Sequence, residues 1–216
     1  MRRFNNILLV VTGSQDQRYE LTRAVDLAEN NQARLRVVMV AEPISIGMGM
    51  PEGGPISERL QGALLRKCEE HLESMVQPLG KRVAIETGVL LGTPFLEVIR
   101  EVLRRKHDLV MKTAEDPEWL DRLFGSDDMH ILRKCPCPVW LLRSRAPSRF
   151  RNILAAVDVG DGQCPEDYKV QQAVNDQVIQ HSASLAVTEK ARLHIGHAWE
   201  EIHSGRLRGR LLSSLD

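Results

Sequence analysis

Two cysteines with a histidine nearby suggest a possible metal site. Cys135 and Cys137 are separated by one residue, and His130 precedes them by less than two helical turns. Thiolates and imidazoles at short spacing bind transition metals, but the usual motif is Cys-x2-Cys with a second pair of ligands, which the sequence lacks. Pro136 and Pro138 more simply shape the entry to a following strand. We therefore expect no metal site.

Nucleophilic catalysis is also not indicated. Ser14, Ser126 and the cysteines lack a G-x-S-x-G elbow or a histidine in a recognisable frame. We accordingly predict that the protein is not an enzyme.

Four cysteines are too few for a disulfide scaffold, and the longest aliphatic run, Ile7–Val11, is far below the roughly 18 to 20 residues that cross a bilayer. We expect reduced thiols, a cytoplasmic location and no membrane contact.

The elements that must position any site alternate between apolar runs and helical periodicity. Continuous aliphatic runs at residues 6–11, 35–40, 109–111 and 138–142 are typical of strands covered on both faces, and residues 82–89 form an alternating strand candidate. Helix-length segments lie between them. One helix is expected over Ser57–Val76, with a buried stripe of Leu60, Leu64, Leu65, Cys68, His71, Leu72 and Met75. This order predicts an α/β fold with a parallel sheet.

An internal repeat determines the domain organisation. The segment Arg3–Thr12 returns as Arg149–Asp158, and Leu27-Ala28 with Ala33-Arg-Leu35 returns as Leu185-Ala186 with Ala191-Arg-Leu193. We predict a first domain at 1–143, a linker at 144–150 and an incomplete second copy at 151–216, ending in a short amphipathic helix. Half an α/β domain cannot cover its own sheet, so the second copy either packs against the first copy or another chain, or is a truncated remnant.

Charge and loop composition limit the possible partners. Lys and Arg total 29 and Asp and Glu total 29, which gives no global field for a polyanion. Basic clusters at 104–107, 143–151 and 206–210 lack interleaved aromatic residues and are interpreted as solvated helix ends and a linker, so no nucleic acid partner is expected. The Gly-, Pro- and Met-rich segment at 43–55 is either a mobile lid or a tolerated surface loop.

The order of these elements and motifs resembles the universal stress protein family. The motifs are the turn Thr12-Gly-Ser14, the segment Val89-Leu-Leu-Gly-Thr-Pro94, the pair Gly125-Ser126 and the run Leu132–Trp140, which looks most like tandem members of the E type. The resemblance implies an open five-stranded parallel sheet of order 3-2-1-4-5 with helices on both faces, plus a partial second copy. It also implies a non-enzymatic role in stress response.

Nucleotide-binding members of this family carry an Asp after the first strand and a G-x2-G-x9-G-[ST] loop around the phosphates. Here Thr12 stands at the Asp position, Lys112 and Glu115 stand at the first two glycine positions, and only Gly125-Ser126 survives. The second copy keeps Asp158 but lacks the loop. Negative charge and lost close-approach glycines disfavour ATP. Gly125-Ser126 is also explained as the start of a helix capped by Ser126.

The resemblance places any pocket above the carboxyl ends of the first and fourth strands, where it would hold a small apolar or weakly anionic ligand. One alternative is an ATP-binding switch with at most slow hydrolysis, in which Lys112 contacts phosphate by charge; another is a partner-docking unit without a ligand. The predicted lining residues are Thr12, Gly13, Val40, Ala41, Lys112, Thr113, Gly125 and Ser126.

The last strand of the first copy is expected at the sheet edge. Val139-Trp-Leu-Leu142 carries no charge to guard that edge, and the family commonly pairs it antiparallel with another copy. Since the second copy ends before its own last strand, we predict a homodimer through this edge.

Overall fold

The computed structural model of the chain describes residues 4–13, 17–44, 54–114, 127–143, 149–159 and 165–198. The polypeptide divides into a first unit, Arg3–Pro147, and a second unit that contains Ser148–Asp216. Residues 144–148 of the predicted linker lie outside the described residues, as do most of the segment at 43–55 and all of 199–216.

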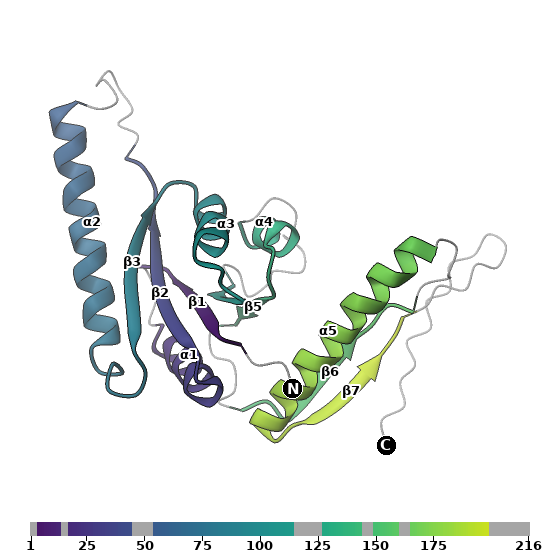
Figure 1. Cartoon of the computed structure of the whole chain (residues 1–216). Coiled ribbons are helices and arrows are strands. Elements are labelled where there is room, and N and C mark those ends of the chain that lie inside the picture. The colour runs from purple at the N-terminus through teal and green to yellow at the C-terminus, as the bar shows by residue number, and fades with distance from the viewer. Residues whose placement is uncertain are drawn as a thin grey trace. The chain divides into compact units, whose positions relative to one another are not determined.

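The first unit contains a five-stranded sheet whose order is β3-β2-β1-β4-β5, and all neighbouring strands are parallel (Figure 1). This topology confirms the predicted fold. The strands alternate with helices along the chain, as parallel crossovers require. The elements are β1 (Asn6–Val11), α1 (Arg18–Asn31), β2 (Arg34–Ala41), α2 (Pro55–Val76), β3 (Ile85–Leu91), α3 (Pro94–Arg105), β4 (Leu109–Thr113), α4 (Asp127–Lys134) and β5 (Val139–Leu142).

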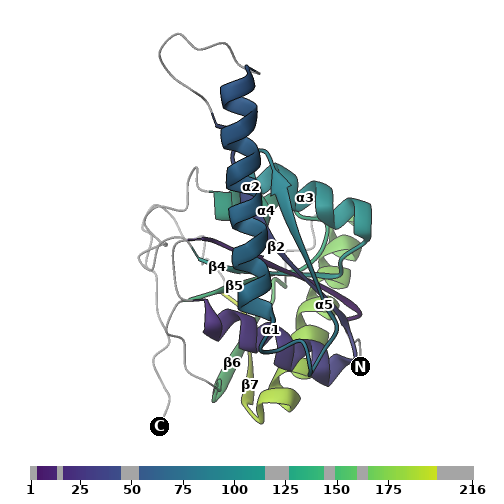
Figure 2. The ribbon, with the colours of Figure 1, turned by 90° about the vertical axis from the view of Figure 1, so that its left-hand side faces the viewer.

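Each face of the sheet is covered by a helical layer, because successive side chains of a strand point to opposite faces. Ile7, Leu9 and Val11 of β1 pack in the core beneath α1 and α2, while Leu8 and Val10 pack beneath α3 and α4. Figure 2 shows α1 and α2 in front of the sheet and α3 behind it. Burial on both faces explains why β1 is apolar from Ile7 to Val11.

The structure differs from prediction in several element boundaries and in the buried stripe of α2. Helix α2 begins at Pro55 rather than Ser57. Strand β3 begins at Ile85 rather than Arg82, because residues 81–83 still belong to the turn after α2 and pairing with β2 starts at Leu35 opposite Ile85. The buried stripe predicted for α2 is wrong at its N-terminal end. Leu72 is fully buried, but Leu60 is 49% exposed. Leu60 lies in the N-terminal half of α2, which extends beyond the sheet (Figure 2). His71 is also exposed although it lies in the C-terminal half beside buried Leu72, because it is on the side of the helix that faces away from the sheet.

The second unit consists of β6 (Asn152–Ala156), α5 (Pro165–Glu189) and β7 (Arg192–Gly196). The two strands pair in parallel, with Asn152 opposite Arg192. One face of this pair packs on α5, but Leu154 and Ile195 are 68% and 59% exposed. The unit therefore has one face that packs on α5 and one face, carrying Asn152, Leu154 and His194, that is open within it.

No helix within the described ranges combines the length and the apolar character needed to span a membrane.

Candidate functional site

The carboxyl ends of β1 and β4 are adjacent at the centre of the sheet, where the strand order changes direction. The structure brings together six of the eight predicted site residues along this edge: Thr12, Gly13, Val40, Ala41, Lys112 and Thr113 end or follow β1, β2 and β4. The other two, Gly125 and Ser126, lie outside the described residues, as does Glu115. We call the region formed by these six residues the carboxyl-edge site.

A buried glutamine closes the crevice between β1 and β4. The Gln17 side chain, 2% exposed, accepts a hydrogen bond from the Thr12 backbone N–H at 2.7 Å. Its amide donates to the Thr113 hydroxyl at 3.2 Å. Because Gln17 satisfies the Thr12 N–H, that donor is already engaged at the place where a ligand would approach β1.

The Lys112 ammonium does not point into open solvent above the sheet. It lies 2.7 Å from an Asp128 carboxylate oxygen on α4, and the two side chains are only 4% and 6% exposed. Lys112 alternates with Met111 and therefore faces the helical layer of α3 and α4. Its charge is compensated inside the protein by the first turn of α4.

Small residues and a thioether shape the rest of the carboxyl-edge site. The space beside Gly13 is bounded by the Met39 sulfur, which would lie 3.8 Å from a Cβ at that glycine. At the end of β2, Val40 is half-buried and Ala41 is buried, and the Ala41 carbonyl accepts a hydrogen bond from Gly92 N–H at 3.0 Å. The described surface thus offers apolar contacts and hydroxyls more than unpaired charge.

The cysteine pair proposed and rejected as a metal motif forms a dithiol contact. The Cys135 and Cys137 sulfur atoms are 3.6 Å apart. The hydrogen bond from Cys137 lowers the pKa of the Cys135 thiol to about 7 and raises that of Cys137, because the shared proton stays on Cys137. His130 does not join them; its ring stacks on Phe95 with centroids 4.6 Å apart. Within the described ranges, no three potential ligands among His, Cys, Asp and Glu converge.

The fold and motif order match one known family. The model of the universal stress protein family matches residues 3–143, which is the whole first unit as described. The chain therefore belongs to the universal stress protein family.

Its relatives include longer proteins of the E type. It is 27% identical over 206 residues to universal stress protein E of Photorhabdus laumondii, an alignment that covers 92% of this chain and 63% of the relative. It is 28% identical over 189 residues to universal stress protein E of Escherichia coli K12, covering 86% of this chain and 58% of the relative. The chain thus spans about three fifths of the length of these proteins.

Solved structures show the same fold. A universal stress protein from Archaeoglobus fulgidus superposes with a TM-score of 0.65 at 16% identity, covering 90% of this chain and 66% of that one. The universal stress protein UspA from Lactobacillus plantarum gives a TM-score of 0.56 at 21% identity, covering 66% of this chain and all of that one.

Two residues of the carboxyl-edge site were missed by the sequence analysis. Asp128 could have been found, because a first-turn acidic residue of a helix is a natural partner for a lysine that interrupts an apolar strand. Gln17 carries no such signal, since it follows a turn with no periodic pattern and only the folded backbone brings it to Thr113.

Proposed function

We propose that this chain is a non-enzymatic binding or scaffold protein of the stress response, and that its carboxyl-edge site no longer cradles a triphosphate. Family membership supports the stress-response role. The cytoplasmic location expected from the cysteine content stays a prediction.

One observation carries the proposal: the buried ion pair of Lys112 and Asp128. Relatives that bind nucleotide use a glycine at the position of Lys112, which lets backbone N–H groups approach phosphate oxygens. Here the side chain occupies the α3 and α4 face, and its ammonium is held by Asp128 at 2.7 Å. The alternative ATP-binding switch needs Lys112 to contact phosphate, which would leave the Asp128 carboxylate buried without its cation.

The engaged backbone of β1 supports the same conclusion. The Thr12 N–H is hydrogen-bonded to Gln17, so a phosphate could recruit it only by displacing a side chain that is 2% exposed. The remaining described surface of the site, with Val40, Ala41 and the Met39 sulfur near Gly13, favours a small apolar or weakly anionic ligand.

Isothermal titration calorimetry of the 216-residue chain with magnesium and ATP tests this proposal. We expect a dissociation constant weaker than about 10 μM, or less than about 7 kcal/mol of binding free energy. A matched variant places glycine at both positions and removes the acid that pairs with Lys112: Lys112→Gly, Glu115→Gly and Asp128→Ala. This variant should bind more tightly than the wild type. Tight wild-type binding that Lys112→Met abolishes would instead establish the switch.

We also propose that the chain forms a homodimer through β5. This strand is the edge of the sheet, and Val139, Trp140 and Leu141 are half-buried with no charge among them. The Pro138 and Leu142 carbonyls accept hydrogen bonds from β4 at 3.0 and 2.8 Å. Backbone groups alternate along a strand, so those of Val139 and Leu141 point away from β4 and are available to a second copy.

The substitution Leu141→Pro tests the dimer without breaking the sheet. Proline removes the outward N–H of residue 141, while the bonds to β4 come from its neighbours. Sedimentation velocity at micromolar concentration should show a dimer for the wild type and for Leu141→Thr, and a monomer for Leu141→Pro. A monomeric wild type would refute the proposed interface.

A further inference from the structure

The first unit contains a pocket of about 460 Å³ at the edge of the sheet opposite the carboxyl-edge site. It lies at the amino ends of β1, β2 and β3 and the C-terminal end of α3. We call it the amino-edge pocket. Leu35, Ala84 and Ile85 also border it. Its polar lining consists of Asn6, Arg34, Arg36, Glu86, Arg105 and His107.

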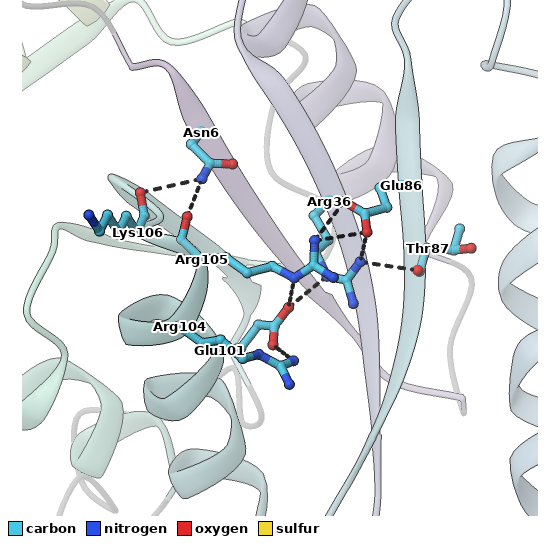
Figure 3. A network of polar contacts seen from close by, with 8 residues as sticks. All are labelled: Asn6, Arg36, Glu86, Thr87, Glu101, Arg104, Arg105 and Lys106. Carbon is cyan, nitrogen blue, oxygen red and sulfur yellow. Dashed lines mark hydrogen bonds and ion pairs between the residues drawn. The ribbon is translucent and has the colours of Figure 1, made fainter.

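A network of ion pairs, of which Arg36–Glu101 is buried, holds the guanidinium groups of the pocket in place (Figure 3). Arg36 lies 2.6 Å from Glu86 and 2.7 Å from Glu101, and its side chain is 9% exposed. Arg105 lies 2.8 Å from Glu86 and 3.0 Å from Glu101. Arg104 binds the other Glu101 oxygen. The network thus fixes two arginines at the pocket before any ligand arrives.

Positive charge exceeds negative charge around this pocket. Arg36, Arg104 and Arg105 share two carboxylates, Glu86 and Glu101, which leaves one positive charge in the network. Arg34 adds a second, because it is exposed at the start of β2 and makes no ion pair with any described residue. A partly enclosed pocket with excess guanidinium charge attracts oxyanions, whose geometry matches the arginine fork.

His107 is the observation that points to a ligand. Its side chain lines the pocket and the residue is only 5% exposed, yet neither ring nitrogen has a hydrogen-bond partner. The Asn6 carbonyl lies near the ring without hydrogen-bond geometry to either nitrogen. Burial lowers the pKa of His107, and Arg36 and Arg105 lower it further against the opposing effects of Asn6 and Glu101. The neutral imidazole therefore presents one donor and one acceptor.

We propose that the amino-edge pocket binds a small organic oxyanion, a carboxylate or a phosphate monoester, through Arg34, Arg105 and a hydrogen bond from His107. Unpaired buried polar atoms destabilise a folded protein, and such a ligand would satisfy the imidazole while neutralising the excess charge. This site is separate from the carboxyl-edge site and does not depend on the proposed function.

Histidine-selective ¹H–¹⁵N spectra of the 216-residue chain test the proposal directly. Inorganic phosphate and succinate are titrated separately, against potassium chloride at equal ionic strength. We expect saturable shifts of the His107 ring nitrogens with a dissociation constant of about 1 mM or below for at least one probe. Phosphate alone identifies a phosphate ester and succinate alone identifies a carboxylate. No His107 shift with either probe overturns the proposal.

Three charge variants separate binding from a purely structural network. Arg34→Gln should weaken binding about fivefold without changing the fold, because Arg34 is exposed and unpaired. Glu86→Gln should tighten binding about threefold, since it releases Arg36 and Arg105 from a competing carboxylate. Arg100→Gln, which removes an exposed charge outside the pocket, should have no effect. Equal behaviour of all three variants would overturn the proposal.

Discussion

Removing the acid of the Lys112–Asp128 pair should destabilise the first unit strongly. The substitution Asp128→Asn keeps the size of the side chain but leaves the Lys112 ammonium, 4% exposed, without its carboxylate at 2.7 Å. Breaking a buried ion pair from one side costs about 3 to 5 kcal/mol, which is a large share of the about 5 to 15 kcal/mol that stabilises a typical domain. The double variant Lys112→Met with Asp128→Leu removes both charges and should recover most of that loss.

Hydrogen exchange of the β1 amides is a suitable assay, because β1 is fully buried and its exchange reports global opening of the first unit alone. The matched control is Arg100→Gln. Arg100 and Glu97 are 2.5 Å apart, but the arginine is 67% exposed, so its loss should cost only about 0 to 1 kcal/mol. If Asp128→Asn lowers the free energy of unfolding by no more than Arg100→Gln does, the Lys112–Asp128 pair does not stabilise the first unit. The argument that Lys112 is unavailable to a ligand then fails.

Three further outcomes follow from the structure. A Cβ at Gly88 would overlap the Arg36 guanidinium. Gly88→Ala should therefore lower the free energy of unfolding, measured by chemical denaturation, by about 1 to 3 kcal/mol. A much smaller change would show that the ion pairs of Arg36 do not hold it in place. The rate of alkylation of Cys135 by iodoacetamide should rise as the pH passes through about 7, because the thiol ionises there. Cys137→Ala removes the hydrogen bond that lowers this pKa, so it should move the midpoint of the rate profile to higher pH. In the intact chain, the backbone amides of β6, Asn152–Ala156, should exchange faster than those of β1, because one face of the β6–β7 sheet is open within the second unit. Equal protection of the two strands would indicate that this face is covered.

The fold was predictable because burial leaves a strong mark on sequence. A strand covered on both faces is mostly apolar, and the aliphatic runs within β1, β2, β4 and β5 show this directly. The ends of elements were less predictable. In α2, apolar residues continue past the edge of the sheet, so Leu60 has the periodicity of a buried position without a surface to pack on.

The carboxyl-edge site was predictable as a place but not as a set of contacts. Strand order fixes which carboxyl ends are neighbours, and Thr12, Gly13, Lys112 and Thr113 follow from it. The bond from Gln17 to Thr113 joins residues separated by 96 positions in the chain. Such a contact has no signal in the sequence, because Gln17 stands between β1 and α1, where no periodic rule applies. The amino-edge pocket was missed for a similar reason, since His107 and Arg34 meet only through the parallel register.

Two charged residues in otherwise apolar strands show how the helices on one face are positioned. Arg36 of β2 and Lys112 of β4 point to the same face, and each is paired with a buried acid of a covering helix: Glu101 of α3 and Asp128 of α4. Apolar packing alone tolerates sliding of a helix along a sheet, whereas a buried ion pair is satisfied at one position only. The same two pairs therefore orient α3 and α4, leave Arg36 at the amino-edge pocket, and withdraw Lys112 from the carboxyl-edge site.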